Sequence, residues 1–285
     1  MATTTCSNGT KARFEGKNVL LTGASSGLGR SLALQLASCG VQTLLLSARK
    51  QAELEKVKAQ CETLASESLD VQIVLADLSD KESVAKLAES ARTANIDVLV
   101  NNGGVSSRSD FVDTSIEVDE TVMQINFLSG AALAKAVVPG MIQKGQGAII
   151  WISSVQGLLA IPSRTSYCAS KHAVQGYCES MRAELASTGV TVHVASPGYI
   201  RTNLSLSAVT GDGKAYGKVD PTTAAGADPD EVAVTILDAV TKGSADFTVA
   251  SGFSATVAIY LRTLCPAVLR SLLNKRYEKS KKKDD

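Results

Sequence analysis

Ser154, Tyr167 and Lys171 lie in one stretch of the sequence, where an apolar run changes into a helical pattern. Tyr167 and Lys171 are four residues apart and therefore share one face of the predicted helix. A free tyrosine has a pKa of about 10, and a lysine cation about 4 Å away would lower that pKa. The phenol could then exchange a proton with a substrate oxygen near neutral pH while Ser154 hydrogen-bonds that oxygen. Ser154 and Tyr167 are accordingly the candidate substrate contacts, and Lys171 is the third candidate catalytic residue.

The Tyr-x-x-x-Lys spacing alone is weakly specific, because Tyr277 and Lys281 repeat it in a charged C-terminal segment where a solvated surface is expected. Tyr167 is distinguished by Ser154 at a predicted strand end and by a glycine-rich turn after the first apolar run. Glycines let a backbone approach a pyrophosphate closely, and the following helix presents free N–H groups to it. An ordinary turn is the alternative for this segment taken alone. Its candidate dinucleotide-binding residues are Gly23, Ser25, Ser26, Gly27, Leu28 and Gly29.

The second apolar run ends with Ser47, where an acidic residue would hold an adenosine ribose hydroxyl, and Arg49 follows. A missing carboxylate and a nearby guanidinium favour NADP(H) over NAD(H). The alternative is that Arg49 is a solvated surface residue. Ligands of such sheets bind at the carboxyl ends of the strands, so the ends of the third and fourth runs supply further candidate cofactor contacts. These are Asp77, Leu78, Asn102 and Gly103.

The elements that must position these residues are seven apolar runs of strand length that alternate with helical patterns. Near-continuous apolar runs are typical of strands covered on both faces. The alternation predicts an α/β fold, a doubly wound, seven-stranded parallel sheet of the Rossmann type in a single domain. A capping box at residues 79–82 and an Asp-Pro pair at 228–229 mark the starts of two helices. The expected strands cover residues 18–22, 43–47, 71–76, 98–101, 148–153, 192–195 and 246–249.

Three segments are expected along the chain: a disordered lead-in over residues 1–15, the catalytic domain over 16–250, and a basic helical extension over 251–285. The lead-in has no apolar run typical of a signal peptide or an N-terminal anchor. The extension predicts two short helices separated near Pro266, each apolar on one side and basic on the other. An interfacial membrane anchor and a contact within the core or an oligomer are both consistent with this pattern.

The overall composition excludes some classes of function. A formal net charge of +1 argues against binding to nucleic acid. The six cysteines are scattered and predict reduced thiols in a cytosol-facing protein. His172 and His193 have no metal-ligand spacing, so no metal site is expected. The polar segment 205–228 is expected to be a mobile lid, without a cluster of Arg or Lys within it that would clamp a substrate phosphate.

The chain resembles the short-chain dehydrogenase/reductase family from residue 16 to about 243, through the glycine-rich turn, Asn101-Asn102-Gly103-Gly104, Ser154, Tyr167-x-x-x-Lys171 and Pro197-Gly198. The family usually has alanine where this chain has Gly103. The resemblance implies that Asn126 is a fourth catalytic residue, which anchors a water relay to Lys171. It also implies a homodimer or homotetramer formed through the helices around residues 122–138 and 166–185. The cofactor contacts that it adds are Pro197, Gly198, Ile200 and Thr202.

Four further segments, 77–80, 153–173, 196–205 and 208–220, are similar to a membrane-associated, lipid-metabolising branch of that family. The similarity implies an apolar or lipid-like carbonyl substrate and a location at the endoplasmic reticulum or peroxisomal membrane surface, with a soluble cytoplasmic protein as the alternative. The expected function is NADP(H)-dependent reduction of a ketone, or oxidation of the corresponding secondary alcohol. The alternatives are an NAD-dependent alcohol-oxidising dehydrogenase and a non-catalytic dinucleotide-sensing or lipid-binding protein.

Overall fold

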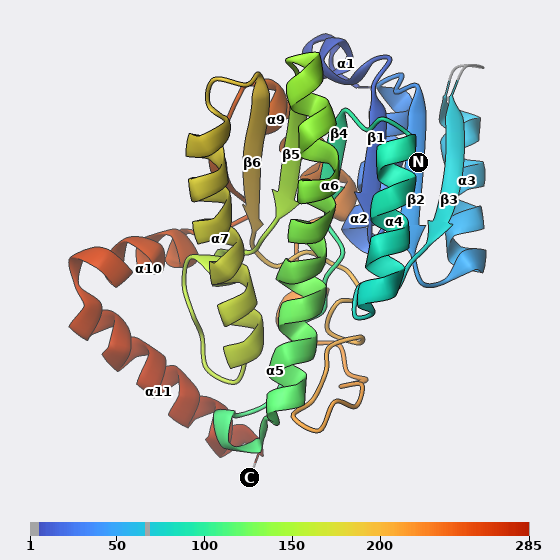
Figure 1. The fold of residues 1–285 in the computed structure, drawn as a ribbon. Coiled ribbons are helices and arrows are strands. Elements are labelled where there is room, and N and C mark those ends of the chain that lie inside the picture. The colour runs from blue at the N-terminus through green and yellow to red at the C-terminus, as the bar shows by residue number, and fades with distance from the viewer. Residues whose placement is uncertain (1–5, 66–68, 285) are drawn as a thin grey trace.

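The computed structural model describes residues 6–65 and 69–284. Its centre is a seven-stranded, all-parallel sheet with the strand order β3-β2-β1-β4-β5-β6-β7 (Figure 1). This sheet confirms the predicted fold class, and each predicted strand corresponds to one observed strand with small shifts at the ends. The strands are β1 (Asn18–Thr22), β2 (Thr43–Ala48), β3 (Asp70–Leu75), β4 (Val98–Asn101), β5 (Gly147–Ile152), β6 (Val190–Pro197) and β7 (Asp246–Val249).

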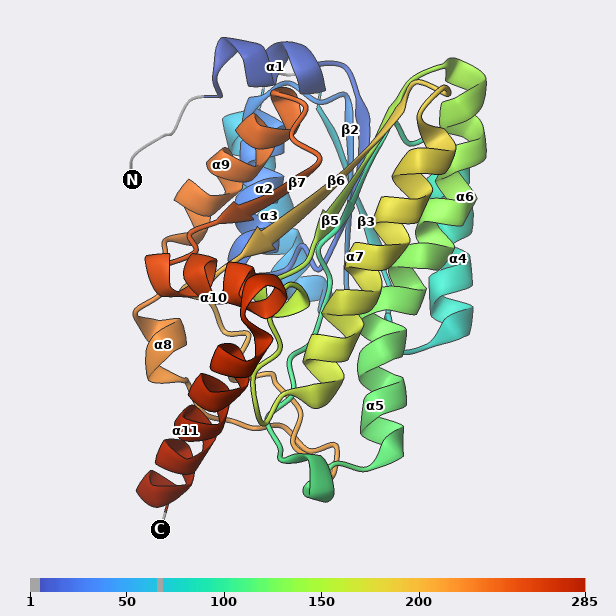
Figure 2. The ribbon, with the colours of Figure 1, turned by 90° about the vertical axis from the view of Figure 1, so that its left-hand side faces the viewer.

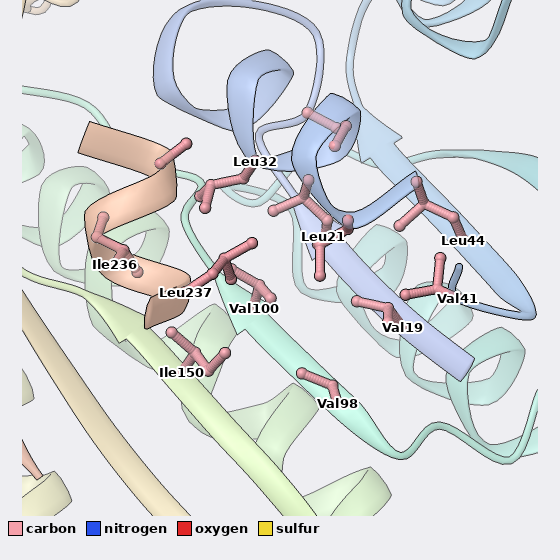
Figure 3. Packing of buried hydrophobic residues seen from close by; sticks show 14 of the residues in the cluster. Val19, Leu21, Leu32, Val41, Leu44, Val98, Val100, Ile150, Ile236 and Leu237 are labelled. Carbon is pink, nitrogen blue, oxygen red and sulfur yellow. The ribbon is translucent and has the colours of Figure 1, made fainter. Parts of the chain in front are cut away.

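Helices cover both faces of the sheet, as the near-continuous apolar strands require (Figure 2). On one face lie α2 (Gly27–Ser38), α3 (Gln51–Leu64) and α9 (Pro229–Thr241). On the other face lie α4 (Lys81–Thr93), α6 (Ser129–Lys144) and α7 (Thr165–Leu185). The first apolar layer includes Leu32 of α2 and Ile236 of α9, which pack beside Leu21 and Val100 of the strands (Figure 3). Because successive strand residues point to opposite faces, Leu20 joins the second layer instead.

One continuous helical segment spans residues 116–144. It consists of α5 (Ile116–Met123), the π-helix η2 (Gln124–Leu128) and α6. By length and composition alone this segment could cross a membrane. Of its most apolar 18-residue stretch, 44% is buried inside the fold. In Figure 1 it runs alongside α4 and α7, where α6 packs in the second apolar layer of the sheet. The buried part of its apolar surface therefore belongs to the core of the fold.

The predicted helix starts are reproduced with one difference. Asp228 caps α9 and Pro229 occupies its first turn, as predicted. At α4 the N-cap is Asp80 instead of Ser79, and the Asp80 carboxylate accepts a hydrogen bond of 3.0 Å from the Glu82 N–H. The Ser79 hydroxyl instead donates to the carboxylate two residues before it.

The prediction of a disordered lead-in is wrong for residues 8–14, which form helix α1 (Asn8–Phe14). Ser7 caps this helix by accepting a hydrogen bond from the Thr10 N–H. Phe14 is buried in the first apolar layer, and the Thr10 hydroxyl donates to Asp238 of α9. Residues 1–5 lie outside the described residues. The burial of Phe14 supplies the stabilisation that so short a helix lacks by itself.

The prediction of six reduced thiols is wrong for Cys6 and Cys39, which form a disulfide that ties the segment before α1 to the end of α2. The two cysteines are 33 positions apart in the sequence, and only the docking of α1 brings them together. Free thiols remain at Cys61, Cys168, Cys178 and Cys265.

The C-terminal extension forms α10 (Phe253–Leu264) and α11 (Pro266–Asp284), so the break predicted near Pro266 is confirmed. Both helices lie at the end of the molecule toward which the strands run (Figures 1 and 2). Arg262 of α10 donates to the Leu158 carbonyl at 2.8 Å, and Tyr277 of α11 donates to Asp110 at 2.7 Å. The extension is thereby fastened to two of the loops that follow the strands.

Candidate active site

A cavity of about 630 Å³ opens at the carboxyl ends of the strands. Ser154 and every residue predicted to bind the cofactor line this cavity, whereas Asn126 does not. The fold therefore brings the predicted residues together from six separate segments, namely those that follow β1 to β6. Their individual roles remain predictions.

The glycine-rich turn between β1 and α2 is closed so tightly that side chains would not fit. A Cβ on Gly29 would lie 2.1 Å from the Gly23 carbonyl oxygen and 2.6 Å from Asn102 Nδ2. Gly23 and Gly27 have φ values of +66° and +52°, which glycine adopts at little cost. Asn102 Nδ2 donates to the carbonyls of Thr22 and Gly23 at 3.0 and 3.2 Å. This bare backbone next to a helix N-terminus fits the pyrophosphate of a dinucleotide.

Gly103, in the loop after β4, packs against this turn. Its N–H donates to the Thr22 hydroxyl at 3.0 Å, and a Cβ at this position would lie 2.5 Å from Leu78 Cδ1. Glycine in place of the family's alanine therefore lets Leu78 approach the backbone at this point. On the opposite side of the turn, a Cβ on Gly27 would lie 2.9 Å from Thr202 Cγ2, which places the segment after β6 against the same wall.

The cavity is lined by Ser47 and Arg49 at the end of β2 and by Asp77 after β3. Ser47 is buried, whereas the Arg49 side chain lies at the exposed rim. The Asp77 carboxylate accepts hydrogen bonds from the Ser79 N–H and hydroxyl at 2.9 and 2.7 Å. Burial opposes ionisation of Asp77, but these hydrogen bonds and the Arg49 cation lower its pKa below the usual value. Asp77 is thus a charged acceptor.

Tyr167 and Lys171 project from α7 and are both buried. Lys171 Nζ donates to the Ile152 carbonyl at 2.8 Å and lies 5.8 Å from the centre of the Tyr167 ring. Ser154 follows β5, accepts a hydrogen bond from the Gln156 N–H at 3.1 Å, and hydrogen-bonds Tyr167. Three of the four predicted catalytic side chains therefore converge at one point of the cavity wall.

The predicted lowering of the Tyr167 pKa is wrong for this structure. Burial raises the pKa of the phenol, and the hydrogen bond with Ser154 and the charges of Arg164 and Arg108 only partly offset the rise. Burial also lowers the pKa of Lys171 to about 8, so its ammonium group is charged at neutral pH. Because its pKa is raised, the Tyr167 phenol keeps its proton at neutral pH. It can donate that proton to an oxygen that gains negative charge.

Asn126 lies in the π-helix η2 and is buried. Its Nδ2 donates to the Val105 carbonyl and the Ser170 hydroxyl, each at 2.9 Å, and its Oδ1 accepts from the Val105 N–H at 2.8 Å. A Cβ on Gly104 would lie 3.1 Å from Asn126 Oδ1 and 3.7 Å from Lys171 Nζ, so both atoms lie on the same side of Gly104. Asn126 therefore ties the loop after β4 to α7 close to Lys171.

The cavity wall also contains Arg108 and Arg164, which no sequence motif indicated. Both donate hydrogen bonds to Asp220. They come from segments that are far apart in the sequence, so no local motif could have indicated the cluster. Among the described residues, no group of three or more His, Cys, Asp or Glu side chains is arranged to hold a metal ion.

Comparison with known proteins gives the family. The family model described as short chain dehydrogenase matches residues 17–212. The chain belongs to the short-chain dehydrogenase family. A Drosophila melanogaster relative, "Dehydrogenase/reductase SDR family protein 7-like", is 44% identical over 267 residues, which cover 93% of this chain and 81% of the relative. The Danio rerio "Dehydrogenase/reductase SDR family member 7B" is 42% identical over 280 residues, which cover 96% of this chain and 90% of the relative.

A solved structure agrees with this assignment. The short-chain dehydrogenase from Sphingobium yanoikuyae in complex with NADPH matches with a TM-score of 0.72 and 26% identity, covering 93% of this chain and 95% of that one. Other similar structures contain NADP or NAD. The protein is therefore a Rossmann-type oxidoreductase of this family.

Proposed function

We propose that this short-chain dehydrogenase uses NADP(H) to reduce a ketone, or to oxidise the corresponding secondary alcohol, on an apolar or lipid-like substrate. The observation that carries the proposal is the convergence of Ser154, Tyr167 and Lys171 in the cavity that also contains the glycine-rich turn. A protein that only sensed a dinucleotide would need the turn but not the proton-transferring side chains. The catalytic interpretation is therefore preferred to the binding-only alternative.

The side chains divide the work of reduction between them. A bound nicotinamide supplies the hydride for reduction, or takes it up in oxidation. Ser154 holds the carbonyl oxygen by a hydrogen bond, and Tyr167 donates its proton to that oxygen, so that hydride and proton together yield the alcohol. The Lys171 cation stabilises the phenolate that remains until Tyr167 regains a proton from solvent. Because burial keeps Tyr167 protonated, the phenol is in the form that donates a proton during reduction at neutral pH.

The choice of NADP(H) over NAD(H) rests on the charges at the end of β2. Ser47 offers no carboxylate, and Arg49 and Lys50 lie at the exposed rim of the cavity where a ribose phosphate would be expected. Glu53, which also lines the cavity, pairs with Lys56 at 2.9 Å. The rim therefore has a net positive charge.

The proposed location is a membrane surface facing the cytosol, on the endoplasmic reticulum or the peroxisome, and the extension supports contact with such a surface. Phe253 and Leu264 of α10 are 85% and 75% exposed, and Arg262 and Arg270 lie near them in the sequence. Apolar side chains beside basic ones are typical of helices that lie on a lipid surface. A homodimer or homotetramer through α6 and α7 is proposed from the family resemblance.

A panel of apolar ketones and secondary alcohols, each assayed with NADPH and with NADH, tests this function. We expect one alcohol formed for each NADPH oxidised, with a kcat/KM at least about tenfold higher for NADPH, since a charge-assisted contact to the phosphate is lost with NADH. A preference for NADH would support the alcohol-oxidising alternative. Dinucleotide binding without turnover of any compound would support the non-catalytic alternative.

A further inference from the structure

Gln156 is a buried amide in the cavity wall, two residues after Ser154. It lies in the short helix η3 (Val155–Gly157), which follows β5, and it is only 7% exposed. Gln156 lines the cavity together with Ser154 and Tyr167. Its backbone N–H donates to Ser154 Oγ at 3.1 Å. Gln156 therefore lies directly beside the group that is proposed to hold the substrate carbonyl.

The side-chain amide of Gln156 has an unused donor. Its Oε1 accepts a weak hydrogen bond, at 3.8 Å, from the Cys168 thiol. Among the described residues, its Nε2 donates to no protein atom. A primary amide nitrogen carries two N–H donors, and buried polar groups are normally hydrogen-bonded because leaving them unpaired is costly. The unpaired donor is therefore an anomaly if Gln156 only fills space.

The open space that this donor faces is the cavity. Within the described part of the chain, the side-chain polar atoms that are fully enclosed and lack a partner belong to Asn18, Asn101, Ser166 and His193. Gln156 Nε2 is not one of these enclosed atoms, so it is still accessible. Because little of Gln156 is exposed and the residue lines the cavity, a molecule that enters the cavity can reach this donor.

The position of Gln156 is fixed by the packing of η3 against α7. A Cβ on Gly157 would lie 2.7 Å from the Lys171 carbonyl oxygen and 2.7 Å from Ser153 Oγ, so the two elements approach too closely for a side chain there. The Gly157 N–H also donates to the Ser154 carbonyl at 2.8 Å. Since α7 carries the proposed proton donor, Gln156 is held at a defined place relative to it. A group that stabilises a transition state must be fixed in this way.

We propose that Gln156 is a further catalytic residue, which donates a hydrogen bond from Nε2 to the carbonyl oxygen of the substrate. The inference rests on the proposed reductase function, because it adds a residue to that same site. The carbonyl oxygen is the one acceptor that every ketone has, and Ser154 is proposed to hold it beside Gln156. The amide keeps its hydrogens throughout, so Tyr167 remains the source of the proton.

The charge that develops during reduction gives this donor its effect. The carbonyl oxygen gains negative charge as the hydride arrives, and a fixed donor stabilises that charge. Burial raises the pKa of Tyr167 and so makes the phenol a weaker acid. More charge therefore remains on the oxygen for Gln156 to stabilise before the proton is transferred.

Two variants, Gln156→Leu and Gln156→Met, remove the amide and keep most of its volume. We expect each to lower kcat/KM for the reduction of cyclohexanone by roughly 10- to 100-fold, because one fixed donor to a developing oxyanion is lost. The infrared frequency of the ketone carbonyl reports the contact itself, since a hydrogen bond weakens the C=O bond. With isotopically labelled cyclohexanone bound beside NADP⁺, which has no hydride to give, both variants should shift this frequency upward from the wild-type value.

Gln175 of α7 supplies the matched control. It is also buried, but its Nε2 donates to Ser153 Oγ and Ser196 Oγ, at 3.1 and 2.9 Å, and Gln175 does not line the cavity. Gln175→Leu removes a buried amide of the same kind, so it should leave the carbonyl frequency at the wild-type value. Quenching of Trp151 fluorescence by NADPH checks that each variant is folded and binds the cofactor.

The infrared measurement separates this inference from the reductase proposal, because it needs no turnover. A carbonyl frequency that depends on Gln156, in a protein that transfers no hydride, would support the contact and refute the reductase. Reduction of cyclohexanone, with the same carbonyl frequency in the wild type and both Gln156 variants, would refute the contact alone. A fall in kcat/KM without a frequency shift would mean that Gln156 only supports the loop, and it would also overturn the inference.

Discussion

Lys171 sets the pH range of the proposed chemistry. Its Nζ is buried against the Ile152 carbonyl, and burial lowers its pKa to about 8. The ammonium group is charged below that pH and neutral above it. After Tyr167 donates its proton to the substrate, the phenolate that remains is stabilised only while Lys171 is charged.

The kcat for ketone reduction should therefore fall as the pH rises through about 8. A pH profile with saturating NADPH and ketone measures this directly. Lys11→Gln, which removes an exposed lysine of α1, should leave the profile unchanged. A kcat that stays constant well above pH 8 would show that the charge of Lys171 is not needed.

For single residues, the sequence predicts which side chains meet but not their protonation states. The spacing of Tyr167 and Lys171 and the strand end at Ser154 were enough to group them. The direction of the Tyr167 pKa was not predictable, because it depends on how completely α7 buries the ring against the loops. Asn126 lies in a π-helix, and no local pattern of the sequence indicated that irregularity.

The β1–α2 turn is the element that the proposed cofactor site depends on most. A Cβ at Gly29 would overlap the Gly23 carbonyl, so Gly29→Ala must move the backbone. Since overpacking of this kind costs about 1 to 3 kcal/mol, we expect NADPH affinity to fall by about tenfold or more, measured by quenching of Trp151 fluorescence. Gly176→Ala in α7 is the matched control, because a Cβ there meets no atom within 4 Å. Equal affinity in both variants would contradict the proposed phosphate site.

The second Tyr-x-x-x-Lys pair has a structural role that the sequence analysis did not anticipate. Asp110 accepts hydrogen bonds from Ser163, Tyr277 and Lys281, at 2.7, 2.7 and 2.5 Å. These partners, Lys281 foremost, lower the pKa of Asp110 to about 2. Because the folded pKa is depressed, the contact holds α11 in place above about pH 4 and is lost as the pH falls toward 2.

Asp110→Asn should release α11 at neutral pH. The helix is rich in Lys and Arg, so trypsin should cleave within residues 266–284 about tenfold faster, given the usual strength of hydrogen bonds to charged groups. Mass spectrometry of the fragments measures the rate. Asp212→Asn removes an exposed carboxylate that pairs only within its own turn, and it should leave cleavage unchanged. Unaltered cleavage in Asp110→Asn would mean that α11 is held by other contacts.

For the whole molecule, the apolar surface of the extension makes a prediction about membranes. Phe253 and Leu264 are largely exposed, and burying each in lipid is worth about 1.5 to 3 kcal/mol. The double variant Phe253→Ser/Leu264→Ser should therefore bind vesicles of phosphatidylcholine and phosphatidylserine at least about tenfold more weakly than the wild type in co-sedimentation. Leu64→Ser, an exposed apolar position on α3, is the control. Unchanged vesicle binding, with loss of a dimer in light scattering, would indicate an oligomer contact instead.

The chain order of strands and helices was predictable because each apolar run is short and its neighbours are marked by glycine, proline or caps. Features that join segments far apart in the sequence were not predictable in this way. The Cys6–Cys39 bridge needs α1 to dock on the core, and the cluster at Asp220 needs three segments to meet. Periodicity describes single elements and carries no information about such pairings.

The most direct test of the central claim is hydride transfer in Tyr167→Phe. We expect loss of ketone reduction in a single turnover with bound NADPH, while NADPH still quenches Trp151 as in the wild type. Tyr177 lies on the same helix, and its ring packs against Phe127 and Trp151. The control variant Tyr177→Phe removes only the hydroxyl of that ring and should keep its turnover. Reduction at the wild-type rate by Tyr167→Phe would show that Tyr167 does not donate the proton, and the proposed mechanism would be wrong.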